Sequence, residues 1–363
     1  NGLVLDKNGN KMSKRFGNSV DPFSAIEKYG ADPLRWYMIT NSQPWDNLKF
    51  DIDGVEEVMR KFFGTLYNTY SFFALYANID GFTYKEDEIP FNTRPEIDRW
   101  ILSELHTLIK NVDECMNDYE PTKAGRMIQD FVDEYLSNWF VRLSRRRFWK
   151  GEYTADKISA YQTLYQCLVT VAQLAAPIAP FFMERLFKDL NDITGKINAE
   201  SVHLTDFPKY NEAYIDKDLE ERMQMAQKIS SMVLSLRKRN NLRVRQPLNK
   251  IMIPVKDDRV KQQIMAVESL ILSEVNVKQI DYLDESNNML VKRIKPNFKT
   301  LGPRYGKLMK QISQKISEFT QDDINKIETE ERYLLTIDNE NVEILISDVE
   351  IITEDIPGWV VTN

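Results

Sequence analysis

The chain has 363 residues, of which 42% are hydrophobic and 11% aromatic, and its formal net charge is -7 at pH 7. This length allows two or three domains, the acidic balance argues against a protein built wholly to bind phosphate backbones, and no apolar run reaches the ~18–20 residues of a membrane span. Its two cysteines and two histidines are too scattered for a four-ligand zinc site, and so few cysteines favour a reducing cytoplasm over secretion.

The first fifty residues carry clear turn and helix-start signals. The apolar residues 2–5 precede Asn8-Gly9, a tight-turn pair that tolerates positive φ, and the basic run KMSKR follows at 11–15, so a hairpin leading into a mobile basic loop is predicted. Asp21-Pro22 begins a helix through Tyr29, and Asp32-Pro33 begins a second one to about residue 40. Because the chain opens without methionine in what looks like the middle of an element, we expect a piece of a longer protein.

Long amphipathic helical patterns dominate the next part of the chain. Apolar residues recur at helical spacing from Val55 to Phe73, and further helices are predicted over 94–118, 121–149, 155–176 and 178–194. Five such helices with short polar connections predict an antiparallel bundle. A linker-like stretch at 195–214 and a helix over about 215–240 follow.

The last third changes to β-branched segments. Strands are predicted at 251–253, 275–283, 289–294, 333–337, 342–346 and 349–353, with helices at 257–273 and 306–319 between them. The expected fold is therefore mostly α, a helical bundle followed by a small α+β domain. The expected domains are residues 1–52, 53–205 and 206–363.

The run Lys11-Met12-Ser13-Lys14-Arg15 resembles the KMSKS signature loop of class I aminoacyl-tRNA synthetases. KYGADPLRWYMI at 28–39 is similar to that family's segment from the signature loop into the stem-contact region, and Arg15 replaces the family's serine, as is common in its isoleucine branch. The resemblance implies that all five residues bind ATP and that Lys14 and Lys11 are catalytic, because placed ammonium groups stabilise charge building on phosphoryl oxygens. Taken alone, the pentapeptide also fits a solvated basic turn.

The resemblance extends through essentially the whole chain. PWDNLKFD at 44–51 and NWFVRLSRRRFW at 138–149 are similar to the helical anticodon-binding domain of the isoleucine branch, and KPNFKTLGPRYG at 295–306 to its eukaryotic-like members, which lack a C-terminal zinc module. The valine and leucine branches share the fold and are the nearest alternatives. The family's HIGH motif and nucleotide-binding domain precede the loop, so this piece is expected to bind tRNA without catalysis. ATP and Mg²⁺ are expected only in the full-length enzyme.

The first of three basic clusters that could contact tRNA lies at the end of the predicted helix 121–149. It comprises Arg142, Arg145, Arg146, Arg147, Trp149 and Lys150. Arginine pairs with phosphate bidentately and an exposed aromatic side chain stacks on an unpaired base. The alternative is that the aromatic residues are core and the arginines pair with nearby acids. Trp139 and Phe148 are expected in the core.

Two further clusters follow in the C-terminal third. The second comprises Arg237, Lys238, Arg239, Arg243 and Arg245, although helix-end capping also accounts for the first three. The third runs from Lys292 to Lys315 without an acidic residue. The expected partner is tRNA, specifically the isoleucine tRNA, and not DNA or a membrane. Two other classes remain open: a freestanding RNA-binding protein derived from a synthetase, and a helical protein-interaction domain whose binding would be insensitive to salt.

Overall fold

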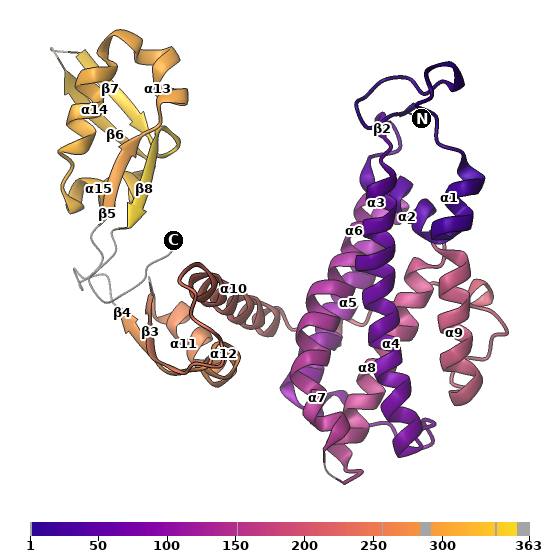
Figure 1. Cartoon of the computed structure of the whole chain (residues 1–363). Coiled ribbons are helices and arrows are strands. Elements are labelled where there is room, and N and C mark those ends of the chain that lie inside the picture. Colours follow the sequence, from indigo (N-terminus) through magenta and orange to yellow (C-terminus); the bar gives the residue numbers. More distant parts are fainter. Residues whose placement is uncertain (1, 151, 256, 284–291, 338–339, 354–363) are drawn as a thin grey trace. The chain divides into compact units, whose positions relative to one another are not determined.

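The computed structural model describes residues 2–150, 152–255, 257–283, 292–337 and 340–353. The chain divides into two compact units, residues 1–220 and residues 221–363 (Figure 1). The first unit is dominated by helices, and the second combines helices with two-stranded sheets. The mostly helical fold predicted from the sequence is confirmed. Within the described residues, no helix is both long and apolar enough to cross a membrane.

The chain begins with a short strand that pairs with a second strand 44 residues further along the sequence. β1 (Val4–Leu5) pairs in parallel with β2 (Leu48–Lys49), and a single antiparallel bridge joins Leu5 to Lys11. The predicted turn is present, since Gly9 has a φ of 87°. The predicted hairpin is therefore present only as this single bridge, with the Asp6 N–H donating to the Asn10 carbonyl over 2.8 Å, and the longer pairing of β1 is with β2.

Two helices connect this strand pair to the bundle. In α1 (Pro22–Tyr29) the Asp21 side chain accepts the Ser24 backbone N–H as an N-cap, as its Asp-Pro start predicts. α2 (Ala31–Asn41) follows, and Tyr29 and Tyr37 from these helices pack with Leu48, Phe50 and Val55 in one small core.

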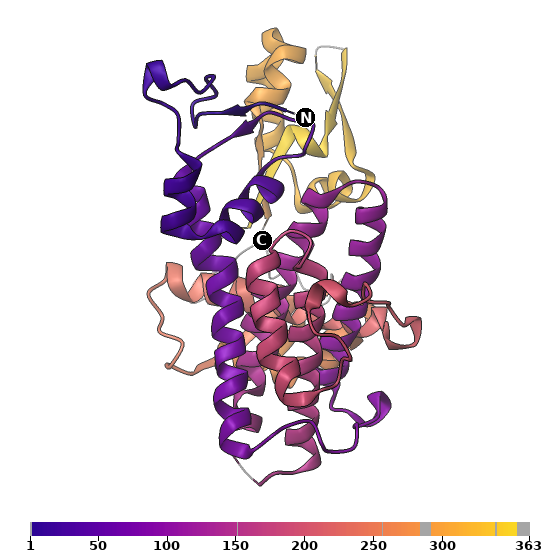
Figure 2. The same cartoon turned by 90° about the vertical axis from the view of Figure 1, so that its right-hand side faces the viewer.

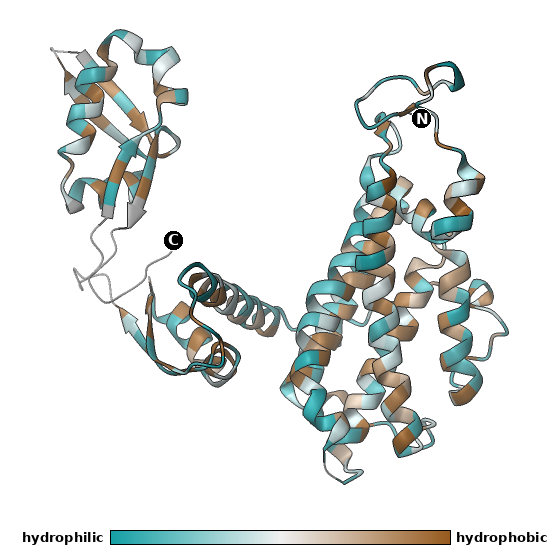
Figure 3. Cartoon of the chain, viewed as in Figure 1, coloured by the Kyte–Doolittle hydropathy of each residue, from teal (hydrophilic) through white to brown (hydrophobic). Residues whose placement is uncertain are grey.

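Five helical stretches form the bundle, as predicted (Figures 1 and 2). They are α3 (Ile52–Val58), the π-helical segment η2 (Met59–Phe63) and α4 (Gly64–Asp80); α5 (Glu96–Asn117); α6 (Pro121–Asp130), the π-helical segment η4 (Phe131–Val141) and α7 (Arg142–Trp149); α8 (Ala155–Ala175); and α9 (Pro180–Thr194). α8 is buried on nearly every side and packs against α5, α7 and α9. Figure 3 shows hydrophobic and hydrophilic stretches side by side along these helices.

The predicted linker at 195–214 is packed onto the bundle. It contains two short 3-10 turns, η5 (Val202–Leu204) and η6 (Glu212–Tyr214). Tyr214 stacks on Phe91 with ring centroids 4.3 Å apart, and the Asn211 backbone N–H donates to His106 Nδ1 over 3.1 Å. Burial lowers the pKa of His106 to about 4, so this ring is neutral at pH 7 and suited to accept that bond.

The first turn of α10 (Lys217–Arg239) is held against α5 by Glu220, a partly buried acidic residue. The hydroxyls of Ser103 and Thr107 donate to Glu220 Oε1 over 2.6 and 2.8 Å, and Lys217 Nζ lies 2.7 Å from Glu220 Oε2. Burial, reinforced by the Glu220 carboxylate, raises the pKa of the neighbouring Glu104 to about 7.

Replacing Glu104 by glutamine is therefore expected to stabilise the protein at alkaline pH. The folded protein binds the Glu104 proton more tightly than the unfolded chain, so its free energy of unfolding falls as pH rises from about 4.5 to about 7. Glu104→Gln removes this penalty, which is on the order of 3 kcal/mol for a pKa raised from 4.5 to about 7, and retains an acceptor for Trp100 Nε1. Urea unfolding of the variant and of the unaltered chain at pH 8 and pH 4.5 measures this difference in the free energy of unfolding. Equal stabilisation at both pH values would contradict a raised pKa at Glu104.

The second unit contains two small arrangements of strands and helices. β3 (Leu248–Pro254) pairs in parallel with β4 (Val277–Leu283), with α11 (Asp258–Ala266) and α12 (Glu268–Val275) between them in sequence. β5 (Lys292–Pro296) pairs antiparallel with β8 (Val349–Thr353), and β6 (Arg332–Ile337) with β7 (Glu340–Leu345). α13 (Phe298–Tyr305), α14 (Met309–Ser317) and α15 (Gln321–Glu330) complete this part, with a core of isoleucines, Leu301, Leu335 and Val342. Part of the predicted strand 289–294 lies outside the described residues.

Candidate nucleic-acid interface

The signature loop, Lys11 to Arg15, is held in shape by one amide side chain. Asn18 Oδ1 accepts the Ser13 backbone N–H over 2.8 Å, while its Nδ2 donates to Asp6 Oδ2 over 2.9 Å and to the Lys11 carbonyl over 3.2 Å. The Asn18 hydrogen bond is the largest cause of a lowered pKa at Asp6. Asn18 was not among the predicted site residues. Its position directly after Gly17, at the end of the basic run, was the one sequence feature that could have indicated a role in holding the loop.

The loop presents its cations to solvent. Lys11, Lys14 and Arg15 are exposed, whereas Met12 is half-buried against the small core around Tyr29. A 3-10 turn, η1 (Lys14–Phe16), closes at Gly17, whose φ of 65° favours glycine. Two ammonium groups and a guanidinium on one loop, with no acidic residue from 11 to 20, suit a polyphosphate ligand.

α7 separates its side chains into an outer and an inner face. At ~100° per residue, Arg142, Arg145, Arg146 and Trp149 fall within an arc of about 100° on one side of the helix. Arg145 and Arg146 are exposed, form no hydrogen bond or ion pair with the residues that the structure describes, and lie beside Trp149, which is 55% exposed. Lys150 is exposed directly after the helix. These side chains are available for a polyanion and for stacking on a base.

The inner face of α7 contains Ser144, Arg147 and Phe148. The prediction that Arg147 contacts RNA is therefore corrected. Arg147 Nη1 and Nη2 lie 2.5 and 2.8 Å from the two carboxylate oxygens of Asp98, which is fully buried. A second acid, Asp156, accepts from Arg147 Nε over 3.1 Å. The Arg147 guanidinium is thus used inside the bundle instead of facing RNA. Trp139 and Phe148 are buried, as predicted.

The helix α7 and the signature loop lie at opposite ends of the bundle (Figure 1). Asp98, the partner of Arg147, lies in the first turn of α5, whereas Thr122, just beyond the end of α5, donates to the Ile39 carbonyl near the N-terminal strands. The 22 residues of α5 span about 33 Å at ~1.5 Å per residue. The two basic regions can therefore contact distant parts of one extended ligand.

Like the cluster on α7, the second basic cluster contains both exposed cations and one arginine that is used inside the protein. Lys238, Arg239, Arg243 and Arg245 are exposed, whereas Arg237 is only 2% exposed. Its guanidinium donates to the carbonyls of Arg243, Gln246 and Asn276 over 2.9–3.0 Å. The prediction that Arg237 contacts RNA is corrected, because its donors are used on backbone carbonyls.

The third basic run lies on β5, α13 and α14. Arg304 forms an ion pair with Asp348 at 2.6 Å, and Lys315 lies 3.4 Å from Glu318. Lys295, Lys299, Lys307 and Lys310 are exposed. This run therefore contains both internally paired and outward-facing cations.

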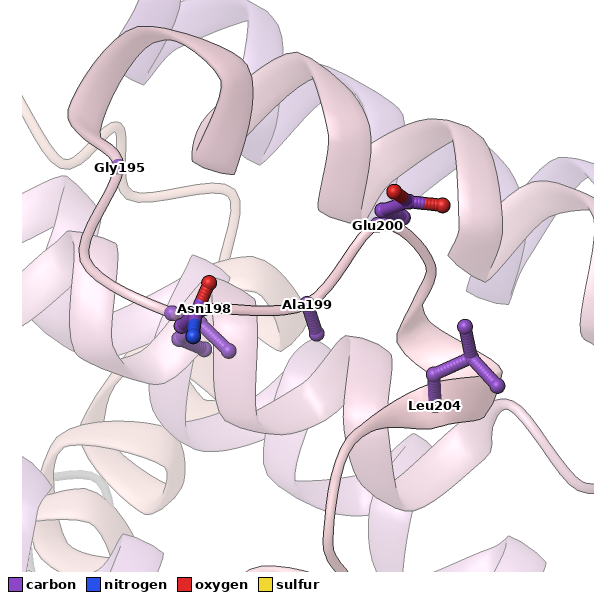
Figure 4. A pocket seen from close by; sticks show the side chains of 6 residues that line it. Gly195, Asn198, Ala199, Glu200 and Leu204 are labelled. Atoms are coloured by element: carbon purple, nitrogen blue, oxygen red, sulfur yellow. The ribbon is translucent and has the colours of Figure 1, made fainter.

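A shallow hollow of about 500 Å³ lies between the end of α9 and η5 (Figure 4). It is lined by Gly195, Ile197, Asn198, Ala199, Glu200 and Leu204. Its one charged side chain is acidic, so it does not suit a phosphate. Among the described residues, no group of three or more histidine, cysteine, aspartate or glutamate side chains could hold a metal ion.

Two family models match separate parts of this chain. Residues 98–253 match the model described as the anticodon-binding domain of tRNA ligase. Residues 1–51, with the signature loop, match the model described as tRNA synthetases class I (I, L, M and V). From the start of α5 to β3, the chain is thus similar to the anticodon-binding domain of tRNA ligases, and its first 51 residues are similar to class I synthetases.

Curated relatives with high similarity to this chain are isoleucine–tRNA ligases. The chain is 64% identical over all its residues to the isoleucine–tRNA ligase of Bacteroides thetaiotaomicron, covering 31% of that protein. Its identity is 63% to that of Porphyromonas gingivalis, with 100% of this chain and 32% of the relative covered. To that of Clostridium tetani it is 40%, with 99% of this chain and 34% of the relative covered. The predicted resemblance to the isoleucine branch is confirmed, and the chain spans about a third of the length of these relatives.

Proposed function

We propose that this chain is the tRNA-binding part of an isoleucine–tRNA ligase and that the outer face of α7 contacts the anticodon region of the isoleucine tRNA. The observation that carries the proposal is that outer face, where Arg145, Arg146 and Lys150 are exposed beside the exposed Trp149. Guanidinium and ammonium groups bind the phosphate backbone and position the RNA, and an indole ring stacks on an unpaired base.

The distance along the bundle supports the same proposal. A tRNA is an extended molecule whose anticodon and amino-acid-accepting end are far apart, and the signature loop and α7 lie at opposite ends of a bundle in which α5 alone spans about 33 Å (Figure 1). The parent ligase would join isoleucine to its tRNA using ATP and Mg²⁺. Lys11 and Lys14 are the side chains of this chain that would face the ATP phosphates, where losing Lys14 should cost roughly 10²–10³ in rate. We expect no activation of isoleucine by this chain alone.

The finer assignments are also part of the proposal. The resemblance of residues 295–306 to eukaryotic-like members rests on that run alone, and the relatives compared above are bacterial. A cytoplasmic location remains a prediction from the low cysteine count. The residues proposed to contact tRNA are now Arg142, Arg145, Arg146, Trp149 and Lys150 on and beside α7, and Lys238, Arg239, Arg243 and Arg245 after α10.

Fluorescence anisotropy with labelled isoleucine, valine and leucine tRNAs at two salt concentrations tests this function. We expect preference for the isoleucine tRNA, loss of that preference when its anticodon is exchanged, and weaker binding at the higher salt because bound cations release counterions. A chain that binds all three tRNAs equally, or none, would contradict anticodon recognition by this part. Binding of a protein partner with no dependence on salt would instead favour a protein-interaction domain.

A further inference from the structure

Arg237 is a buried cation without an acidic partner among the described residues. It lies in the last turn of α10, is 2% exposed, and donates to three backbone carbonyls, those of Arg243, Gln246 and Asn276. Burying a guanidinium without a carboxylate is unfavourable unless its donors are satisfied, and here carbonyls satisfy Nη1 and Nη2, while the buried Nε has no hydrogen-bond partner among the described residues. Its position therefore fixes the path of the chain at 240–247, here called the clamped loop.

Asn276 completes the inner support of the clamped loop. Its Nδ2 donates to the Val244 carbonyl over 2.8 Å, and its own carbonyl accepts from Arg237 and from the Leu248 backbone N–H at 3.1 Å. A tight turn closes where the Gln246 N–H donates to the Arg243 carbonyl over 3.0 Å. Asn241 and Asn276 both adopt positive φ, 54° and 51°, a conformation in which asparagine is enriched. The loop is therefore closely specified from within.

The outer side of the clamped loop is strongly cationic. Arg243 and Arg245 are exposed and, among the described residues, their side chains have neither a hydrogen bond nor an ion pair. From Arg222 to Lys256 the sequence has nine basic residues and no acidic one. The loop and the helix end before it therefore present positive charge without a neighbouring acid in sequence, although the protein as a whole is acidic.

We propose that Arg237 is a positioning residue that preorganises the clamped loop as a phosphate-binding turn, with Arg243 and Arg245 as the contact groups for the RNA backbone. This inference rests on the proposed function, since it takes the ligand to be RNA. Residues 238–247 contain no aromatic side chain on which a base could stack, unlike α7, so the contact is with phosphate and not with bases. A loop already ordered in the free protein avoids the entropy cost of ordering on binding.

The substitution Arg237→Lys tests the inference while keeping the formal charge. A single lysine ammonium cannot replace both Nη1 and Nη2, which together donate to three carbonyls. The clamped loop should therefore be less ordered, and affinity for the isoleucine tRNA is expected to fall by at least about fivefold. The variant Arg243→Gln/Arg245→Gln should weaken binding and reduce the slope of log affinity against log salt by about 1.4–1.8, as for two lost phosphate contacts. Lys228→Gln, which removes an exposed charge from α10 away from the loop, is the matched control and should change affinity less than twofold.

A combined variant separates positioning from a merely structural role. When Arg237→Lys is added to Arg243→Gln/Arg245→Gln, no further loss of affinity is expected, because the groups that Arg237 positions are already gone. Additive losses would overturn the inference. So would unchanged binding by Arg243→Gln/Arg245→Gln, which decides the matter even if Arg237→Lys does not fold.

The outcomes also separate this inference from the proposed function. If the unaltered chain binds no tRNA, the proposed function fails. If it binds, and charge removal on α7 weakens binding while the clamped-loop variants do not, the proposed function stands and the loop is not a contact site. If the loop variants lose binding to polyglutamate and keep their tRNA affinity, the partner of this loop is an acidic protein, and the RNA inference is overturned.

Discussion

Replacing Asp98 by asparagine is expected to lower the free energy of unfolding of the first unit by about 3–5 kcal/mol. The substitution leaves the Arg147 guanidinium, whose side chain is 15% exposed, without its bidentate carboxylate. Ser159 also donates to Asp98 over 2.5 Å, so a hydrogen-bonded group of three residues would be disrupted. Urea unfolding followed by tryptophan fluorescence measures the free energy of unfolding of the first unit, since five of the six tryptophans lie in residues 1–220.

The double variant Asp98→Asn/Arg147→Met provides the internal control. Removing both charges leaves no buried uncompensated ion, because Asp156, the other partner of Arg147, is 52% exposed, so the double variant is expected to be more stable than Asp98→Asn alone. Arg146→Ala, one residue away on the outer face of α7, should change stability by less than about 0.5 kcal/mol. A loss below 1 kcal/mol for Asp98→Asn would mean that the pair contributes little to the fold.

Removing Arg145, Arg146 and Lys150, whose side chains have no ion-pair partner among the residues that the structure describes, is expected to weaken tRNA binding by roughly 10- to 100-fold. The variant Arg145→Gln/Arg146→Gln/Lys150→Gln loses up to three charge-assisted contacts, and a tenfold change corresponds to ~1.4 kcal/mol. The slope of log affinity against log salt should fall by about 2–3. Anisotropy titrations over a range of salt concentrations measure both quantities, and the fold should be unaffected because these side chains are exposed.

The matched control for this variant removes charge from α9. Arg185 and Lys188 are exposed but form ion pairs with Asp189 and Glu184 along their own helix. Arg185→Gln/Lys188→Gln should therefore change tRNA affinity less than twofold. If both variants weaken binding equally, the effect comes from net charge, and α7 is not a specific contact surface.

Helix-start signals and helical periodicity were sufficient to locate the bundle. The Asp21-Pro22 pair predicted the N-cap of α1, and the stripes of apolar residues predicted α4 to α9 with small shifts at their ends. They failed in detail at Tyr67, which belongs to the predicted apolar face but is 57% exposed. At ~100° per residue, Tyr67 lies about 100° around the helix from Leu66 and about 120° from Phe73, both buried, so it falls outside the buried stripe.

The C-terminal third was less predictable from local signals. α13 was missed because Gly302 and Pro303 are weak helix formers, and α15 because its pattern is mostly polar. Both helices are stabilised by burying Leu301, Ile324 and Ile327 in a core shared with distant strands. Burial of this kind depends on partners that a local sequence window does not contain.

By itself, the sequence determined the helical class, the signature loop with its contiguous cations, and the resemblance to isoleucine–tRNA ligases. Only the tertiary structure decided which arginines are available to a ligand. Asp98 is 49 residues from Arg147, and Asn276 is 39 residues from Arg237, yet these partners use the two guanidinium groups inside the protein. Helix and turn propensities act over a few neighbouring residues, whereas the environment of a charge is set by whatever the folded chain packs against it.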